Sequence, residues 1–373
     1  MIRAGVLAEL ILSTELPRQV VVALRVALNG HWARLTVDRN RSAQHRRACL
    51  RGRLAGNGRK HVVRLTTGGE GGMVPKDKFF NLQMFCHPMN MGGHNFSIKK
   101  HTMANNKVWF ITGTSRGFGR IWAEAALERG DKVAATARDK ASLSALTEKY
   151  GDRVLAIALD VTDRGACFSA VAAAKEHFGR LDVVINNAGY GQFGAIEELS
   201  EKEARDQIET NLFGALWITQ AALPIMRAQH SGHILQVSSI GGVTSFPGVG
   251  MYHASKWALE GFSESLAQEV APFGIRVTLI EPAGYETDWS GSSAKRSQPI
   301  AVYDEMRKLP RPTANRGKPE ATAGAILKVV DAAEPPLRLF LGTMPLPLIK
   351  ERYQQRLATW EQWKDVADAA QGN

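Results

Sequence analysis

The chain has 373 residues, of which 44% are hydrophobic and 22% are charged, and its formal net charge is +11. This length allows a large core and two or three domains. Since no run of 18 or more apolar residues occurs, the sequence predicts no membrane-spanning helix. Cys49, Cys86 and Cys167 form neither a metal-binding pattern nor a disulfide framework. Widely spaced cysteines of this kind favour a reducing compartment, and we expect a cytoplasmic protein.

The positive charge is concentrated at the N-terminus. Residues 1–102 contain 17 of the 47 Lys and Arg residues but only 5 of the 36 Asp and Glu residues, whereas the remainder is almost neutral. This segment has basic clusters, glycine runs and no sustained apolar period. We therefore expect residues 1–102 to be a disordered extension, or upstream sequence read as protein, with the fold beginning near Met103. A nucleic-acid-binding or membrane-surface arm is an alternative, as is a targeting segment, although Glu9 and Glu15 are unusual in a transit peptide.

From Lys107 onward, apolar runs of strand length recur, and most are separated by segments of helical length. The runs are "VWFIT", "VAATA", "VLAIAL", "VVIN", "ILQV", "VTLI" and "LRLFLG". They are continuous rather than alternating, which is typical of strands covered on both faces. The pattern predicts an α/β fold with one doubly wound parallel sheet of about seven strands, flanked by helices. A nucleotide would bind at the carboxyl ends of the strands.

The first of these strands ends in "TGTSRGFG", which contains Gly113, Gly117 and Gly119. Glycines between a strand and a helix let the backbone approach a pyrophosphate, whose charge is met by free N–H groups of the helix N-terminus. The second strand ends in "ATARD", where Arg138 stands in place of an acidic residue that would bind a ribose hydroxyl. With Arg116 it would bind a 2′-phosphate, which favours NADP over NAD. For Arg138 alone, a solvated surface position is an equal alternative.

The pentapeptide "YHASK" places Tyr252 and Lys256 four residues apart at the start of a helical pattern. This spacing puts both side chains on one face of a helix. An isolated pair of this kind would usually be no more than a solvated pair on a helix surface. The other motifs of the chain therefore decide its interpretation.

The motifs "TGTSRGFG", "DVTD", "NNAG", "NLFG", "VSS" and "YHASK" occur in the order and at the spacing of the short-chain dehydrogenases/reductases. The resemblance covers about residues 103–345. It implies a single NADP-binding Rossmann-fold domain over residues 103–373. The stretches "NNAGYGQFGAIEELS" and "EPAGYETDW" are similar to the branch that includes 17β-hydroxysteroid and retinol dehydrogenases. The family also implies a homodimer or homotetramer built on the helices that contain Asn211 and Tyr252.

The resemblance implies four catalytic residues. Tyr252 would be the general acid and base, and Lys256 would lower the pKa of the phenol and bind the nicotinamide ribose. Ser239 would bind the substrate oxygen, and Asn211 would hold a water molecule of a proton relay. The implied activity is metal-free hydride transfer between NADP and a carbonyl compound or its alcohol, by an oxidoreductase acting on CH–OH groups. A non-catalytic NADP-binding sensor of the same fold is the alternative.

The resemblance also implies a set of cofactor contacts. They are Gly113, Ser115, Arg116, Gly117, Phe118, Gly119, Arg138, Asp160, Val161, Asn187, Ala188, Gly189, Tyr252, Lys256, Pro282, Tyr285 and Thr287. The family segment "P-G-x-x-x-T" is altered here, because Ala283 replaces its glycine and Gly284 follows. The turn is either changed slightly or displaced by one residue.

A substrate lid is expected over residues 285–317, between the sixth strand and the next helix. Trp289, with Tyr190 and Phe193 after the fourth strand, suggests contacts to an apolar carbonyl substrate. Tyr303 and Met306 are expected to line the same pocket. The tail predicts a helix over residues 346–369 with apolar residues on one side, which would cover either the pocket or a subunit contact.

Overall fold

The computed structural model describes residues 106–309 and 316–372, together with the backbone of six short strands nearer the N-terminus. The chain divides into two compact units, Met1–Lys100 and His101–Asn373. The strands of the first unit form two antiparallel three-stranded sheets. They are β1 (Leu7–Leu12), β2 (Val22–Leu28), β3 (His31–Val37), β4 (Leu50–Leu54), β5 (His61–Thr66) and β6 (Asn81–Gln83). The predicted disorder of residues 1–102 falls mainly outside the described residues and stays a prediction.

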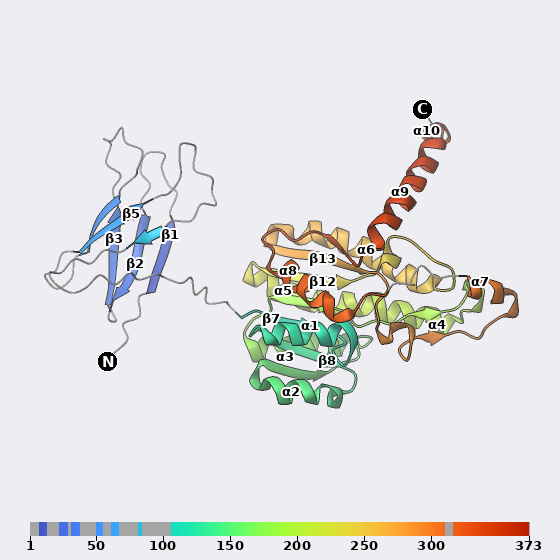
Figure 1. Ribbon diagram of the computed structural model, residues 1–373, viewed down its shortest axis with the longest axis horizontal. Helices are drawn as coiled ribbons and strands as arrows, with labels where there is room; N and C mark the ends of the chain where they lie inside the picture. Colours follow the sequence, from blue (N-terminus) through green and yellow to red (C-terminus); the bar gives the residue numbers. More distant parts are fainter. Residues whose placement is uncertain are drawn as a thin grey trace. The chain divides into compact units, whose positions relative to one another are not determined.

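The second unit is built on one parallel sheet of seven strands, which confirms the predicted fold class (Figure 1). Its strands are β7 (Val108–Ile111), β8 (Lys132–Ala137), β9 (Val154–Ala158), β10 (Val183–Asn186), β12 (Gly232–Val237), β13 (Ile275–Pro282) and β15 (Arg338–Leu341). Their order across the sheet is β15-β13-β12-β10-β7-β8-β9. The strand order therefore reverses between β7 and β10. Open α/β sheets bind ligands in the crevice that such a reversal leaves at the carboxyl ends of the strands.

Helices cover both faces of this sheet and extend from its edge. The main ones are α1 (Gly117–Glu128), α2 (Ser144–Tyr150), α3 (Arg164–Phe178), α4 (Glu201–Ile208), α5 (Gly214–Gln229), α6 (Gly250–Val270), α7 (Asp304–Lys308), α8 (Thr322–Asp331), α9 (Pro345–Gln362) and α10 (Lys364–Ala369). A π-helical turn, η4 (Glu209–Phe213), joins α4 to α5. The 3₁₀ turns η5 (Ile240–Gly242) and η7 (Asp288–Ser290) and the short strands β11 (Gln192–Phe193) and β14 (Lys295–Arg296) lie in the loops around the site.

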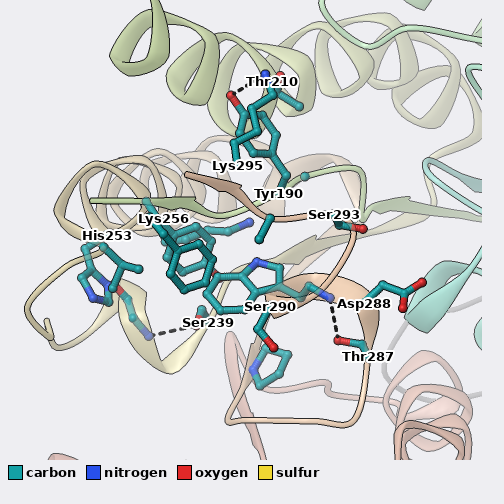
Figure 2. A pocket seen from close by; sticks show the side chains of 18 of the residues that line it. Tyr190, Thr210, Ser239, His253, Lys256, Thr287, Asp288, Ser290, Ser293 and Lys295 are labelled. Atoms are coloured by element: carbon teal, nitrogen blue, oxygen red, sulfur yellow. Dashed lines mark hydrogen bonds between the residues drawn. The ribbon is translucent and has the colours of Figure 1, made fainter. Parts of the chain in front are cut away.

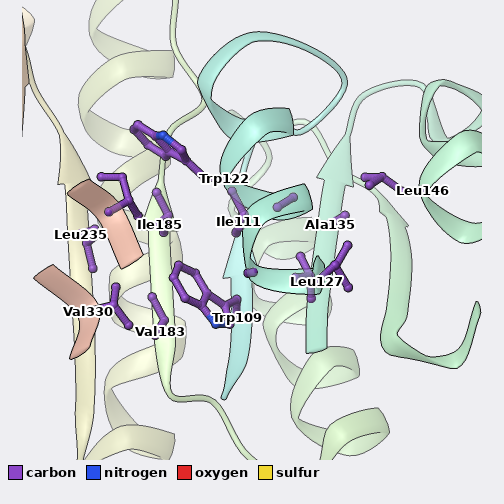
Figure 3. Packing of buried hydrophobic residues seen from close by; sticks show 14 of the residues in the cluster. Trp109, Ile111, Trp122, Leu127, Ala135, Leu146, Val183, Ile185, Leu235 and Val330 are labelled. Atoms are coloured by element: carbon purple, nitrogen blue, oxygen red, sulfur yellow. The ribbon is translucent and has the colours of Figure 1, made fainter. Parts of the chain in front are cut away.

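The continuous apolar runs fill two cores, one on each side of the sheet. In β7, Trp109 and Ile111 point toward the core under α1, α2 and α8, whereas Val108 and Phe110 point toward the core under α3, α5 and α6. Figure 3 shows Trp109 and Trp122 packed among the strands of the first core. Because successive side chains of a strand point to opposite faces, a strand covered on both sides must be apolar at every position.

The C-terminal helix differs from the sequence expectation in its packing. It is broken into α9 and α10, which extend away from the sheet (Figure 1). Of its apolar side chains Ile349 is buried, but Leu357, Trp360 and Trp363 are 51%, 62% and 60% exposed. Within this segment, the cavity described below is reached only by the first turns of α9, through Leu348 and Arg352, and by Met344 just before the helix. Within the described part of the chain, no helix has the length and apolarity needed to cross a bilayer.

Candidate active site

The glycine turn after β7 has the backbone that the sequence predicts. Gly113 and Gly117 have φ angles of +70° and +59°, in the left-handed region that favours glycine. A Cβ atom on Gly119 would overlap the carbonyl oxygen of Gly113 and lie 2.5 Å from Nδ2 of Asn187. Arg116, at the N-cap of α1, provides no side-chain cap, and the first turn contains no acidic residue. The N-terminus of α1 is thus suited to an anionic ligand.

Asn187 fastens this turn to the neighbouring strand β10. Its Nδ2 donates to the carbonyl oxygens of Thr112 (2.9 Å) and Gly113 (3.0 Å). The Thr112 hydroxyl in turn accepts the backbone N–H groups of Asn187 and Ala188, both at 2.9 Å. These hydrogen bonds tie the glycine turn and the end of β7 to the segment that follows β10. The backbone of residues 187–189 lines the crevice between β7 and β10, and the amide of Asn187 is already engaged by the turn.

The outer end of the crevice contains the residues predicted to bind adenosine. Asp160 accepts the N–H and the hydroxyl of Thr162 at 3.0 and 2.8 Å, and this Asx turn fixes the loop after β9. Val161 is buried against Gly214, where a Cβ atom would lie 2.7 Å from its methyl group. Arg138 is exposed beside them and forms no ion pair within the described residues. Its guanidinium is free to meet an anion.

Tyr252 and Lys256 lie on the buried face of α6, with exposed fractions of 7% and 6%. Figure 2 shows Lys256 among the side chains that line the pocket. The Lys256 ammonium donates to the carbonyl oxygen of Val237 at 2.7 Å and lies 5.8 Å from the centre of the Tyr252 ring. Ser239, after the end of β12, accepts the N–H of Gly241 at 3.0 Å, and its hydroxyl acts to lower the pKa of the Tyr252 phenol. The structure thus brings the three predicted catalytic side chains together.

The pKa of Tyr252 is raised in this structure, and burial rather than Lys256 decides its direction. Burial raises the pKa of the phenol to about 12, and the hydrogen bond with Ser239 opposes this change. Burial also lowers the pKa of Lys256 to about 8, against the charge of Glu260. Removal from water disfavours the charged form of each group, and burial is the largest cause of both shifts. Tyr252 is therefore a neutral phenol at neutral pH, which suits a proton donor.

Asn211 lies at the centre of the π-helical turn η4 and is buried. Its Nδ2 donates to the carbonyl oxygen of Tyr190 and to the hydroxyl of Ser255, both at 3.1 Å. Its Oδ1 accepts the N–H of Tyr190, also at 3.1 Å. Ser255 donates to the carbonyl oxygen of Tyr252 at 2.6 Å, so Asn211 is connected to the helix that carries the tyrosine. Single π turns of this kind are frequent at functional sites.

Two polar residues that the sequence did not single out also shape the site. His253 lies between Gly241, whose carbonyl oxygen is 2.8 Å from Nδ1, and Phe246, whose N–H donates to Nε2 at 3.0 Å. It therefore holds the loop that follows Ser239. Ser255 connects Asn211 to α6. The sequence signal for both residues is their position in α6, one and three residues after Tyr252.

Trp289 of η7 covers the tyrosine from the lid. Its ring centre is 4.9 Å from that of Tyr252 and 5.1 Å from that of Phe193. Tyr190 lies under Lys295, whose ammonium is 4.4 Å from the ring centre. All three predicted substrate residues line the cavity, and so does Met306. Tyr303 does not line it, because its hydroxyl turns outward to bond Glu197 at 2.6 Å.

The lid contacts the glycine turn, and the two ends of the lid pair with each other. Nη1 of Arg116 lies 3.4 Å from Asp288 and 3.1 Å from the hydroxyl of Ser292, so this guanidinium faces the lid. Tyr285 pairs with Gly317, which closes the base of the predicted segment 285–317. Residues 310–315 of that segment lie outside the described residues.

Together these elements enclose a cavity of about 1500 Å³ at the carboxyl ends of the strands. This volume exceeds that of a typical single-ligand pocket and is sufficient for a dinucleotide and a substrate. The segment around Ala283 lies at its base, and the ring of Tyr285 packs on Phe118 with a centre distance of 5.2 Å. Among the cofactor contacts implied by the sequence, the lining includes Pro282, Tyr285 and Thr287. In the described residues, no cluster of His, Cys, Asp or Glu could hold a metal ion.

A glycine turn at the switch point of a parallel sheet, with a buried tyrosine and lysine beyond it, defines a dinucleotide-binding oxidoreductase site. The sequence profile of the short chain dehydrogenase family matches residues 107–298. Oxidoreductase BOA17 of Botryotinia fuckeliana is 44% identical over 273 residues, which cover 71% of this chain and 99% of the relative. The chain belongs to the short-chain dehydrogenase/reductase family and is an oxidoreductase.

Solved structures agree with this assignment. A short-chain dehydrogenase from Streptomyces avermitilis is 40% identical with a TM-score of 0.68, covering 72% of this chain and 99% of its own. A short chain dehydrogenase from Burkholderia cenocepacia in complex with NADP is 27% identical with a TM-score of 0.56, covering 69% and 97%. The finer resemblance to 17β-hydroxysteroid and retinol dehydrogenases stays a prediction.

Proposed function

We propose that the protein is an NADP(H)-dependent oxidoreductase that interconverts a carbonyl compound and its alcohol, with Tyr252 as general acid and base. The observation that carries this proposal is the buried phenol of Tyr252, placed at the cavity between Ser239, Lys256 and Trp289. A hydroxyl group hidden from water, with a second hydroxyl and a cation in the same cavity, is suited to proton transfer.

The protonation states of the site suit proton donation to a carbonyl oxygen. With a pKa of about 12, Tyr252 keeps its proton at neutral pH and can donate it to a carbonyl oxygen. Lys256, with a pKa of about 8, is mainly an ammonium ion at neutral pH and would stabilise the phenolate that remains. The Ser239 hydroxyl would give the same substrate oxygen a second hydrogen bond. The nicotinamide, when bound, supplies the hydride.

The residues of the glycine turn fit a dinucleotide. Gly119 leaves no room for a side chain, and the N–H groups at the start of α1 have no side-chain cap. NADP is favoured because the free guanidinium of Arg138 lines the adenosine end, where no acidic residue follows β8 directly. The bound NADP of the Burkholderia cenocepacia relative supports this choice.

Arg138→Ala should weaken NADPH binding by roughly tenfold or more and leave NADH binding nearly unchanged. A charge-assisted hydrogen bond to the 2′-phosphate contributes about 1.5–3 kcal/mol, and NADH lacks that phosphate. Fluorescence titration with both cofactors measures the difference. Arg276→Ala is the matched control, since Arg276 is an exposed arginine at the amino end of β13, away from the cavity. Equal losses for both cofactors would contradict the assignment of NADP.

The substrate side of the cavity favours an apolar carbonyl compound. Trp289 and Phe193 cover Tyr252, and Met306, Met344 and Leu348 contribute further apolar lining. Aromatic and thioether side chains provide a large contact area without a strict shape requirement.

A panel of aldehydes and ketones of increasing apolar chain length tests this function directly. NADPH oxidation is followed with the full-length protein, and Tyr252→Phe serves as the blank for contaminating reductases. We expect turnover that rises with apolar length and is lost in the variant. Consumption of no carbonyl compound, or equal rates in both proteins, would refute the proposal.

A further inference from the structure

A second group of ionisable side chains lies buried behind the catalytic residues. Glu260 of α6 and Glu281 of β13 are 4% and 0% exposed. Nη2 of Arg338 lies 3.3 Å from Glu260 and 3.2 Å from the half-exposed Glu264, and its Nε is 3.8 Å from Glu281. Ser238 is also buried beside Glu260. One arginine is thus shared among three carboxyl groups.

With both buried carboxyl groups ionised, this arrangement leaves many polar atoms without hydrogen-bond partners. Both carboxylate oxygens of Glu260, both of Glu281, the Ser238 hydroxyl and Nη1 of Arg338 have none among the described residues. A Cβ atom on Gly242 would lie 2.5 Å from the Ser238 hydroxyl and 3.0 Å from Oε1 of Glu260, so these groups face each other in a tightly packed space. Buried acceptors left unpaired carry a large desolvation cost.

One additional proton relieves part of this conflict, because it pairs an oxygen of one acid with an oxygen of the other. Two ionised carboxylates can only accept hydrogen bonds, whereas a protonated carboxyl group donates one to its neighbour. Burial and the adjacent charge of Glu260 raise the pKa of Glu281 to about 8, and burial also raises the pKa of Glu260. A hydrogen bond formed by such a proton would raise the pKa of Glu281 and lower that of Glu260, which favours a proton on Glu281 and a charge on Glu260. Such a proton belongs to the pair rather than to one residue.

The charge of the pair lies close to the catalytic lysine. Glu260 follows Lys256 by four residues in α6, and its charge raises the pKa of that lysine against the effect of burial. Three segments of the site meet at the cluster, because Ser238 precedes Ser239 and Glu281 precedes Pro282. When the pair keeps one proton, its single charge and that of Glu264 balance Lys256 and Arg338.

We propose that Glu260 and Glu281 share one proton at neutral pH, and that the remaining negative charge on Glu260 keeps Lys256 in its ammonium form. Both acids act through Lys256 and are positioning residues. The part of this inference that concerns turnover rests on the proposed function, whereas the shared proton does not.

The shared proton is tested by the stability of the full-length protein as a function of pH. Since the folded state keeps a proton that the unfolded state releases, stability should fall as the pH rises from about 4.5 to about 8. Glu260→Gln and Glu281→Gln should each reduce this loss, because a shared proton needs both acids. Glu264 contacts the same arginine but is half-exposed, so Glu264→Gln should show the same loss of stability with rising pH as the wild type. Wild-type melting temperatures that follow the same pH dependence as both buried variants would overturn the shared proton.

The effect on Lys256 is tested by the basic limb of the pH profile for carbonyl reduction. Glu260→Gln should move this limb to lower pH by roughly one unit or more, whereas Glu281→Gln and Glu264→Gln should leave it near the wild-type value. A thermal-unfolding cycle of Glu260→Gln with Lys256→Met measures their coupling without turnover, and the double variant should lose less stability than the two singles together. Absence of turnover in the wild type would refute the proposed function alone. The link to Lys256 would be overturned if the stability losses of the two single variants simply added up in the double variant. It would also be overturned if the basic limb of the pH profile moved equally in the Glu260 and Glu281 variants.

Discussion

Replacing Tyr252 with phenylalanine is expected to lower kcat for carbonyl reduction by about 10²–10⁴-fold while NADPH affinity stays unchanged. The substitution removes one oxygen and keeps the ring that packs on Trp289, so the fold should persist. The proton for the developing alkoxide is then missing, which corresponds to a barrier increase of about 3–5 kcal/mol. Stopped-flow kinetics with the substrate found in the carbonyl panel, together with NADPH titration, separate the chemical step from binding.

Tyr150→Phe is the matched control for this experiment. Tyr150 ends helix α2, and its hydroxyl donates to Glu128 at 3.3 Å. Neither residue lines the cavity, so the same loss of one oxygen should leave kcat unchanged. If Tyr252→Phe kept wild-type turnover, Tyr252 and Lys256 would be a structural pair, and another group would have to supply the proton.

Gly119→Ala is expected to weaken NADPH binding by at least tenfold and to lower stability by about 1–3 kcal/mol. The added methyl group would overlap the carbonyl oxygen of Gly113, a backbone atom that can move only if the turn opens. Overpacking at a site with no free space typically costs this much free energy, and an open turn no longer presents its N–H groups to a pyrophosphate. NADPH titration and thermal unfolding measure the two effects.

Gly261→Ala provides the control for this substitution. Gly261 lies in α6 on an exposed position, with no atom near the place of a Cβ, and alanine there should increase stability by up to about 1 kcal/mol. Wild-type NADPH affinity in Gly119→Ala would show that the turn is not the pyrophosphate site.

The sheet could be predicted because its signal is local. Each apolar run, from "VWFIT" to "LRLFLG", became one of the seven parallel strands, and the glycines between the first strand and α1 have the backbone angles that their position requires. The C-terminal helix was harder to interpret. Its apolar stripe, which includes Leu357 and Trp360, indicates a helix, but the pattern does not tell which surface covers that stripe.

The electrostatics of the site depend on contacts between residues distant in sequence, which no single motif contains. The motif that places Lys256 near Tyr252 suggests a lowered phenol pKa, yet the depth of burial decides the sign of the change. Glu260 and Glu281 belong to two unrelated stretches, and only the packing of α6 against β13 brings them together. For the same reason, Tyr303 could not be distinguished from Met306 by its place in the lid.

The π-helical turn η4 has a consequence for protein engineering. It contains one residue more than a regular helical turn between the same ends, so deleting one residue there would restore an ordinary α-helix from Glu201 to Gln229. The deletion would rotate α4 by roughly 100° relative to α5. Gln207, which accepts the N–H of Gln192 at 2.7 Å and donates to the carbonyl oxygen of Tyr190 at 3.0 Å, would then turn away from that loop. A chimera that borrows this helix from a relative must therefore match its residue count as well as its apolar face.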